Sequence, residues 1–532
     1  MAAPVNEQPI STGNYRLMLI ALIVALGGLL MGFDASVISG VVGFIETKFE
    51  LTKIQLGWSV SSLTLTSTLA MMVSGPLSNR IGRKKVLTYA AILYAISAIG
   101  SALAPDFVSL VIFRMIGGFG VGASLIIAPM YIAEISPPEM RGRMVSFNQL
   151  NIVIGISLAF FTNYLILRYS QSDAAWVKKA HIDTEPWRWM LGLETLPAVL
   201  YFFGLFLVPK SPRWLILKGR FEEAKKIMTR FSNAETADRE MAEIRQSIEE
   251  ESKKEHSKQA GVADLFKPAL RLVITIGIVV AVLQQITGIN SVFFYAPMIF
   301  EQSGIGTDAS FVQAILVGIT NLVFTVLAIL FIDRFGRKPL LIVGVAGIVV
   351  SMFLLSYGFR AAEYSLSEAA FAKTGITADQ ASISALYDHS YPDEQAFREA
   401  AEQQLGTAFY SEHGSTLSNA ALHINPVLIL IGILGFVASF AISIGPVMWV
   451  LFSELFPNRI RGLAISFVGL INSAVSFIVQ LVFPWELEKL GSATTFFIYG
   501  VFALLGFLFI WRYVPETKGK SLEALEKELV RS

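Results

Sequence analysis

The sequence has no cysteine among its 532 residues and few charged residues, at 16%. The lack of cysteine excludes disulfides, thiolate chemistry and cysteine-ligated metal centres. Soluble globular chains carry about 25% charged residues. The low charge, a hydrophobic content of 54% and a mean hydropathy of +0.59 therefore argue against an ordinary water-soluble protein. A formal net charge of only +1 argues against a nucleic-acid partner.

Histidine is also scarce. The five histidines lack the spacing of metal ligands, which disfavours a metal enzyme. No Gly-x-x-x-x-Gly-Lys-Ser/Thr motif is present, which disfavours transport driven by ATP. The sequence therefore predicts no catalytic residue, no metal site, no cofactor and no enzymatic activity.

Long apolar runs dominate the chain. About 20 apolar residues are needed for a helix to cross the hydrocarbon core, and these runs are too long for strands. The first run is too long for a cleaved signal peptide and carries Asp34, so we expect it to be retained. We predict twelve transmembrane helices, at residues 17–42, 56–77, 86–104, 107–135, 144–167, 188–208, 270–300, 311–332, 340–358, 427–456, 460–484 and 492–514.

Most of the 42 lysines and arginines fall on one side of these runs. Because positive residues favour the cytoplasmic side, we predict a cytoplasmic N-terminus, and an even number of spans then places the C-terminus there too. The cytoplasmic clusters are Arg80–Lys85, Arg141 with Arg143, Arg334–Lys338, and Arg459 with Arg461.

Two polar segments interrupt the spans. Residues 209–269 are charged, with helical patterns at 221–231 and 237–254, and form either a solvated linker or a packed plug between two halves. Residues 359–424 form an acidic insert on the outer side, which is either functional, for instance in binding a partner, or disordered. The predicted domains are an N-terminal half, a cytoplasmic helical domain, a C-terminal half with the insert, and a tail, at residues 1–208, 209–269, 270–514 and 515–532.

Two motifs are each repeated. Asn79–Lys84, after span two, recurs as Asp333–Lys338 after span eight, and the Glu-x-x-Pro-x-x-x-Arg-Gly motif beginning at Glu134 recurs at Glu454. Equivalent motifs at equivalent places indicate two pseudo-symmetric six-helix halves of the same orientation, an arrangement in which many transporters bind substrate between the halves.

These motifs lie at cytoplasmic helix ends, where arginine can pair with helix carbonyls and with the glutamate of the other motif. We predict breakable ionic contacts that hold an outward-facing state. Positive-inside topology signalling is the alternative, and four copies at paired positions favour the ionic contacts. The predicted gate residues in these motifs are Arg80, Arg83, Glu134, Arg141, Arg334, Arg337, Glu454 and Arg461.

Three ionisable residues lie inside spans, where charge is costly and is a functional hypothesis by default. Asp34, Arg114 and Glu194 all lie roughly 10–15 Å below the outer surface at 1.5 Å per residue, so they can meet if their helices face inward. Arginine stays protonated. Asp34 is therefore the candidate proton carrier, with Arg114 as a releasable counter-ion. The alternative is a static salt bridge.

Five short motifs, taken together, resemble the sugar porters of the major facilitator superfamily, close to bacterial proton–sugar symporters and glucose facilitators. The resemblance covers all twelve spans and the cytoplasmic segments, but the outer insert has no familiar counterpart. The motif that follows span six adds Arg213 to the predicted gate. The motifs are Gly32–Gly40, Arg114–Gly118, Pro209–Leu215, Gln284–Asn290 and Pro515–Gly519.

The resemblance implies which residues bind the sugar. Amides both donate and accept hydrogen bonds, as sugar hydroxyls require, and an indole offers an apolar face with one donor. The span-seven helix is expected to weaken at Gly288, and Trp449 follows a break expected at Gly445-Pro446. The implied sugar-binding residues are Gln149, Gln284, Gln285, Asn290, Asn321, Trp449 and Asn472.

The chain departs from the family pattern at several positions. Lys210 stands where relatives have glutamate, so one ionic contact at the gate is lost or rewired. Ser473 replaces an aromatic residue that often follows Asn472. Phe294 replaces the tyrosine, and Ile156 the glutamine, of xylose symporters, and this less polar lining resembles glucose-type members.

The resulting prediction is proton-coupled import of a monosaccharide, a hexose such as glucose, by alternating access. A proton-independent facilitator is the main alternative. A sugar sensor is disfavoured by a tail of about 18 residues, and a drug exporter by the uncharged amide and indole positions. The expected partners are sugar, protons and the lipid bilayer, with the protein monomeric. The bacterial inner membrane is the expected location, although a eukaryotic plasma membrane satisfies the same physical criteria.

Overall fold

The computed structural model describes residues 12–136, 140–230, 234–255, 262–392, 394–457, 460–520 and residue 525. Within this part of the chain, eleven helices are long and apolar enough to cross a membrane. The last of them has 53 residues, or about 80 Å at 1.5 Å per residue, against a hydrocarbon core of about 30 Å. Gly491, at φ 76° and ψ 158°, breaks this helix into two spans. The protein is therefore a multi-pass membrane protein with the twelve predicted spans.

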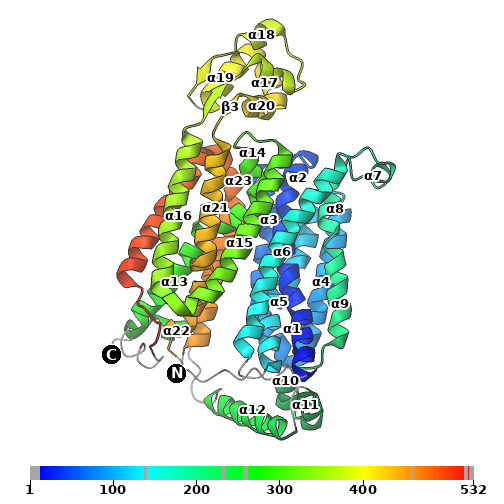
Figure 1. The fold of residues 1–532 in the computed structure, drawn as a ribbon, viewed down its shortest axis with the longest axis vertical. Coiled ribbons are helices and arrows are strands. Elements are labelled where there is room, and N and C mark those ends of the chain that lie inside the picture. The colour runs from blue at the N-terminus through cyan, green and yellow to red at the C-terminus, as the bar shows by residue number, and fades with distance from the viewer. Residues whose placement is uncertain are drawn as a thin grey trace, which may run out of the picture.

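The N-terminal half contains the first six spans (Figure 1, blue to cyan). Its sixth span is broken where Glu194 precedes a second helical segment. The elements are α1 (Thr12–Val37), η1 (Ile38–Gly40), α2 (Val42–Lys48), α3 (Lys53–Ile81), α4 (Arg83–Leu103), α5 (Phe107–Ile135), α6 (Arg141–Ser170), α7 (Ala175–Lys179), α8 (Pro186–Gly192) and α9 (Thr195–Leu207).

The C-terminal half repeats this arrangement (Figure 1, green to red). Its first span breaks at Gly288, which adopts φ 84°, as the sequence predicted. The elements are α13 (Arg271–Ile286), α14 (Ile289–Glu301), α15 (Thr307–Phe335), α16 (Arg337–Arg360), α21 (Pro426–Ile442), α22 (Ile444–Leu455) and α23 (Arg461–Tyr513).

The break in the tenth span lies at Ser443 rather than at the predicted Gly445-Pro446. Ser443 has φ −125° and ψ −102°, whereas α22 already includes Gly445 and Pro446. A proline has no amide hydrogen, and its ring clashes with the carbonyl four residues earlier. The helix therefore breaks at Ser443, in the turn before Pro446, where the preceding carbonyls must turn away from the proline ring.

The repeated Arg-x-Gly-Arg motif has a backbone reason. Gly82 joins α3 to α4 at φ 98° and ψ 147°, and Gly336 joins α15 to α16 at φ 93° and ψ 167°. Side chains disfavour this conformation, whereas glycine adopts it readily. Each glycine ends one span and begins the next within a single residue, which places the following arginine at the start of the new helix.

Three short helices form a small domain beneath the N-terminal half (Figure 1). Leu215, Ile216, Ala224 and Ile227 form its buried core. Trp214 Nε1 donates to the carbonyl of Asn79, which fixes the domain to the end of α3. It is therefore a packed helical domain fixed to the N-terminal half and not a purely solvated linker, and Phe231 lies outside the described residues. Its elements are α10 (Pro212–Leu217), α11 (Phe221–Met228) and α12 (Ala234–Glu255), whereas η2 (Val262–Phe266) and η3 (Pro268–Leu270) pack against α13 of the C-terminal half.

The insert lies at the opposite end of the bundle, above the C-terminal half (Figure 1). It has its own buried core, which includes Leu366, Phe397 and Leu417, and a three-stranded antiparallel sheet of order β2-β1-β3. It is thus a folded domain and not a disordered loop, and its strands are an exception to the predicted all-α fold. Its elements are β1 (Glu363–Ser365), α17 (Glu368–Lys373), α18 (Gln380–Ser384), β2 (Ser390–Tyr391), α19 (Glu394–Leu405), α20 (Thr407–Ala421) and β3 (Leu422–His423).

Two ends of the bundle can now be distinguished. The insert end carries residues 363–423, and the linker end carries residues 212–255 (Figure 1). Within the N-terminal half, α1 and α6 cross closely at glycines: a Cβ at Gly32 would lie 1.9 Å from the carbonyl oxygen of Ile152, and one at Gly155 2.1 Å from that of Leu29. Small residues commonly permit such close packing of membrane helices.

We predict that Gly32→Ala destabilises the protein, because the added methyl group forces α1 and α6 apart. Overpacking costs about 1–3 kcal/mol. Gly75→Ala is the matched control, since it is also helical and has nothing within 4 Å of the position of a Cβ. Thermal unfolding in detergent should show a lower Tm for Gly32→Ala and an unchanged or higher Tm for the control. Equal Tm values for both variants would contradict the close crossing.

Candidate functional site

A buried ion pair connects α1 and α5. Arg114 Nη1 donates to Asp34 Oδ1 at 3.4 Å, and both side chains are at most 2% exposed. Arg114 Nε also donates to the carbonyl of Ser59 on α3, at 3.0 Å. Counting depth along the spans predicted this contact. The guanidinium therefore holds three helices of the N-terminal half at one point.

A second carboxyl group lies beside this pair. Glu194 occupies the break between α8 and α9, is 2% exposed, and interacts electrostatically with both Asp34 and Arg114. Among the described residues, its Oε1 and Asp34 Oδ2 have no hydrogen-bond partner. The site thus contains two buried carboxyl groups and one guanidinium, and each carboxyl keeps one oxygen available.

Three hydroxyl groups surround the acids, and the sequence analysis missed them. Tyr94 interacts with Asp34, Glu194 and Tyr201, and Ser124 lies beside both tyrosines. In the described part of the chain, the hydroxyl oxygens of Tyr94, Ser124 and Tyr201 are buried without hydrogen-bond partners. Hydroxyl residues are common in apolar helices, so their own sequence pattern does not mark them. Only the charged residues beside them could have indicated that these hydroxyl groups belong to the site.

Four of the predicted sugar-binding amides form one hydrogen-bonded network. Asn472 Nδ2 donates to Gln284 Oε1 at 2.8 Å, and Gln285 Nε2 donates to Asn472 Oδ1 at 3.2 Å. Asn290 Nδ2 donates to Gln285 Oε1 at 2.8 Å. The break at Gly288 allows this, because it turns Asn290 on α14 back toward α13 and α23. Gln284 also donates to the carbonyls of Ile444 and Gly445 at the break between α21 and α22.

The network continues through residues that the sequence analysis did not single out. Ser476 accepts from Asn290 at 2.7 Å and from Gln480 at 2.8 Å. Thr64 on α3 donates to Gln480 Oε1 at 2.8 Å, which links the network to the N-terminal half. Ser476 and Gln480 follow Asn472 by one and two helical turns, so helical spacing from Asn472 is the signal that could have found them.

The other three predicted sugar-binding residues lie outside this network. Gln149 is exposed on α6, and Asn321 is buried on α15. Trp449 is 47% exposed and packs edge-on against Phe452. In the described part of the chain, none of the three forms a hydrogen bond with the four amides, although Met448, next to Trp449, accepts from Asn472 at 3.9 Å.

Ion pairs also lie at the linker end of each half. In the N-terminal half, Arg83 forms a bidentate pair with Glu134, at 2.9–3.1 Å, and donates to the carbonyl of Ser78. Ser211 donates to the same glutamate. The start of α4, the end of α5 and the segment after α9 are thereby joined.

The C-terminal half contains the equivalent group. Arg337 Nη2 donates to Glu454 at 2.8 Å and Nη1 to the carbonyl of Ile332, while Thr517 donates to the same glutamate. Glu516 accepts from the amides of Arg337 and Lys338 at the start of α16. Both arginines therefore make the predicted pairs with helix carbonyls and with the glutamate of the other motif.

The remaining gate residues differ in position. Arg80 and Arg334 are exposed, and Arg213 is partly buried. Arg461 Nε donates to the carbonyl of Phe456 at 3.1 Å. The side chain of Arg141 lies outside the described residues. Lys210, the departure from the family pattern, pairs with Glu223 on α11 at 3.0 Å, so the contact at this position is rewired.

Several contacts join the two halves, and they lie toward the insert end. Ser157 donates to the carbonyl of Gly318 at 3.0 Å, and Gln171 donates to Asp308 at 2.6 Å. Gly57 packs so closely against α23 that a Cβ would lie 1.9 Å from the carbonyl oxygen of Leu481. With the contact between Thr64 and Gln480, these interactions close the bundle on the insert side.

Comparisons with known proteins agree with this architecture. Residues 20–378 and 405–529 match the family described as "Sugar (and other) transporter". The arabinose–proton symporter of Bacillus subtilis is 35% identical over 510 residues, covering 96% of this chain and 94% of that protein. The D-xylose–proton symporter of Escherichia coli is 35% identical and covers 95% and 94%. The glucose transport protein of Synechocystis is 33% identical and covers 98% and 100%.

Solved structures give the same result. The inward-open xylose transporter of E. coli superposes with a TM-score of 0.73 at 33% identity, covering 96% of this chain and 100% of that one. The xylose symporter bound to 6-bromo-6-deoxy-D-glucose gives 0.67 at 34% identity, covering 97% and 100%. Two repeated halves, a carboxyl–guanidinium site in one and an amide network in the other thus coincide with full-length similarity to transporters rather than enzymes. The chain belongs to the sugar porter family of the major facilitator superfamily.

Proposed function

We propose that this protein imports a monosaccharide together with a proton, by alternating access. The observation that carries the proposal is the buried site of Asp34, Arg114 and Glu194, in which two carboxyl groups share one guanidinium. The names of the relatives as arabinose–proton and xylose–proton symporters support it.

The charge balance of this site gives it a reason to bind a proton. With all three groups ionised, the site carries a net charge of −1 inside a membrane-spanning bundle, where unpaired charge is costly. One proton shared between Asp34 and Glu194 makes the site neutral. Movement of Arg114 away from Asp34 would strengthen proton binding there, and its return would favour release.

The sugar is proposed to bind at the amide network of the C-terminal half. In the structure the amides of Gln284, Gln285, Asn290 and Asn472 bond to one another. Sugar hydroxyls can replace these bonds one for one, because each can donate and accept. The bond between Thr64 and Gln480 joins the network to α3, whose Ser59 carbonyl accepts from Arg114. Helix α3 therefore supplies a connection between the two sites.

The distribution of charge supports a cytoplasmic linker end, with both termini on that side. Closure at the insert end then corresponds to an inward-facing state. The bacterial inner membrane is the proposed location, and a monomer the proposed state. The proposed domains are residues 1–208, 209–269, 270–514 and 515–532.

The gate is proposed to act at the linker end. The pairs of Arg83 with Glu134 and of Arg337 with Glu454 each join helices of one half, and both are formed while the insert end is closed. They would hold each half together as it moves. That the ionic contacts break between the outward-facing and inward-facing states stays a prediction.

We propose a hexose as the preferred sugar, on the basis of two side chains. Ile156 and Phe294 are apolar where xylose symporters carry glutamine and tyrosine, and Phe294 is buried on α14, the helix that carries Asn290. The named relatives include arabinose and xylose symporters as well as a glucose transport protein, so an uptake panel must contain pentoses and hexoses.

Replacing Asp34 by asparagine should abolish accumulation of sugar against its gradient but preserve exchange of labelled for unlabelled sugar. Asparagine keeps the size of the side chain but cannot bind or release the proton. The measurement is uptake into proteoliposomes with an imposed pH gradient, and Asp173→Asn, on the exposed segment after α6, is the control, since this carboxylate pairs with Lys178 of the same half. Undiminished accumulation by Asp34→Asn would favour the proton-independent facilitator.

Replacing Gln285 by alanine should weaken glucose binding by about tenfold or more, because loss of a buried hydrogen-bond partner costs about 1–3 kcal/mol. Isothermal titration of the purified protein with glucose and with xylose gives both Kd values. Asn163→Ala is the matched control: this amide bonds to the carbonyl of Val37 in the N-terminal half, away from the network. The control should keep the wild-type Kd. An unchanged Kd in Gln285→Ala would place the sugar elsewhere.

A further inference from the structure

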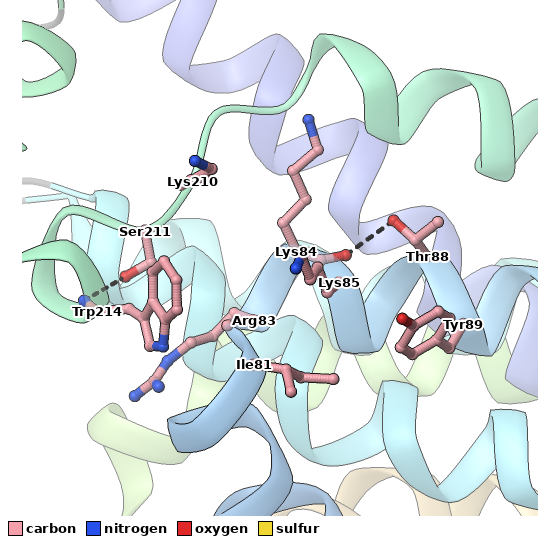
Figure 2. Close-up of a pocket in the computed structure, with 10 residues that line it drawn as sticks. Ile81, Arg83, Lys84, Lys85, Thr88, Tyr89, Lys210, Ser211 and Trp214 are labelled. Atoms are coloured by element: carbon pink, nitrogen blue, oxygen red, sulfur yellow. Dashed lines mark hydrogen bonds between the residues drawn. The ribbon is translucent and has the colours of Figure 1, made fainter. Parts of the chain in front are cut away.

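A pocket of about 260 Å³ lies at the linker end of the N-terminal half. Figure 2 shows it between the start of α4, which supplies Lys84, Lys85 and Tyr89, and the segment after α9, which supplies Lys210 and Trp214. None of the contacts assigned above to the sugar or the proton involves its lysines. The proposed function therefore leaves these lysines unexplained, although Arg83 and Ser211 in the same lining belong to the proposed gate.

The pocket is cationic. Four basic residues line it, and none of its described lining residues is acidic. The charge of Arg83 is balanced by Glu134. Lys210 pairs with Glu223, but that carboxylate lies outside the pocket lining and is shared with Arg220. The lysines therefore leave an excess of positive charge.

The fold holds these cations together. Lys84 and Lys210 lie close enough to repel each other. Within the described residues, Lys84 Nζ donates to one backbone carbonyl, that of Phe206, at 3.3 Å. An anion between the two ammonium groups would convert this repulsion into attraction on both sides.

Part of this charge depends on Lys210, since a glutamate at this position would change the charge of the pocket by two units.

The pocket borders the membrane-facing surface. Lys84 is the second residue of α4, and Lys210 follows the end of α9 by three residues. Phe206 and Leu207, next to the pocket, are 62% and 73% exposed, and Tyr89 is 53% exposed. In a bilayer these apolar side chains contact acyl chains, so the lysines lie at the level of the headgroups.

We propose that this pocket binds a phosphate-bearing anion, supplied by the headgroup of an anionic phospholipid. Other polar groups in the pocket are already used: Thr88 donates to the Lys84 carbonyl, Trp214 Nε1 to Asn79, and Ser211 to Glu134. Recognition therefore depends on ammonium groups, which act as point charges on phosphate. The pocket selects anionic over zwitterionic lipids without distinguishing the rest of the headgroup.

The test is native mass spectrometry of the full chain in neutral detergent, titrated with phosphatidylglycerol and, separately, with phosphatidylcholine. Phosphatidylglycerol should bind more tightly. Lys210→Glu should weaken this binding at least fivefold, since each lysine at a membrane surface contributes about 1 kcal/mol to attraction of anionic lipid. Lys84→Gln provides a second test, with an expected weakening of about fivefold.

Lys226→Glu is the matched control, because it makes the same change of charge on the exposed face of α11, outside the pocket. It should leave phosphatidylglycerol binding within twofold of wild type. Equal weakening by Lys210→Glu and Lys226→Glu, or no preference over phosphatidylcholine, would overturn the proposal. Inorganic phosphate is added in a third arm: displacement of the lipid by millimolar phosphate supports a site for the phosphate group itself, and a lack of displacement supports recognition of the intact lipid.

Discussion

One buried guanidinium is the constraint on which the N-terminal half depends. Arg114 cannot lose its proton, so the surrounding helices must supply compensating charge wherever it lies. It binds Asp34 on α1 and a carbonyl on α3, and Glu194 lies close to it at the break of the sixth span.

The fold was largely predictable because the membrane imposes length and the repeat imposes symmetry. The positions of the breaks within individual helices were less predictable. Gly288 was expected because glycine weakens a helix, and it adopts the expected left-handed conformation. The break at Ser443 was not expected, because Pro446 disrupts the helical turn before it rather than the helix at the proline itself. The fold of the insert could not be predicted from the sequence, because strands of two or three residues are too short to show an alternating hydrophobic pattern.

The sites were predictable to different degrees. Depth along each span was enough to bring Asp34, Arg114 and Glu194 together, since charged groups in a bundle face inward. The amides needed the family resemblance, because an uncharged glutamine carries no comparable directional preference. Ser476 and Thr64 were missed because hydroxyl side chains commonly bond to their own helix. Gln149, Asn321 and Trp449 lie outside the amide network, although the resemblance groups them with it.

The strands that enter and leave the insert are paired, with Glu363 opposite His423. The chain thus departs from α16 and returns to α21 at nearly the same point, and the two helices need no rearrangement to accommodate the insertion. A domain attached through such a narrow stem is carried by the C-terminal half as a rigid extension. Small rotations of the C-terminal half would produce larger displacements at the outer tip of the insert domain. A label on this domain would therefore report the motion of that half in a single molecule.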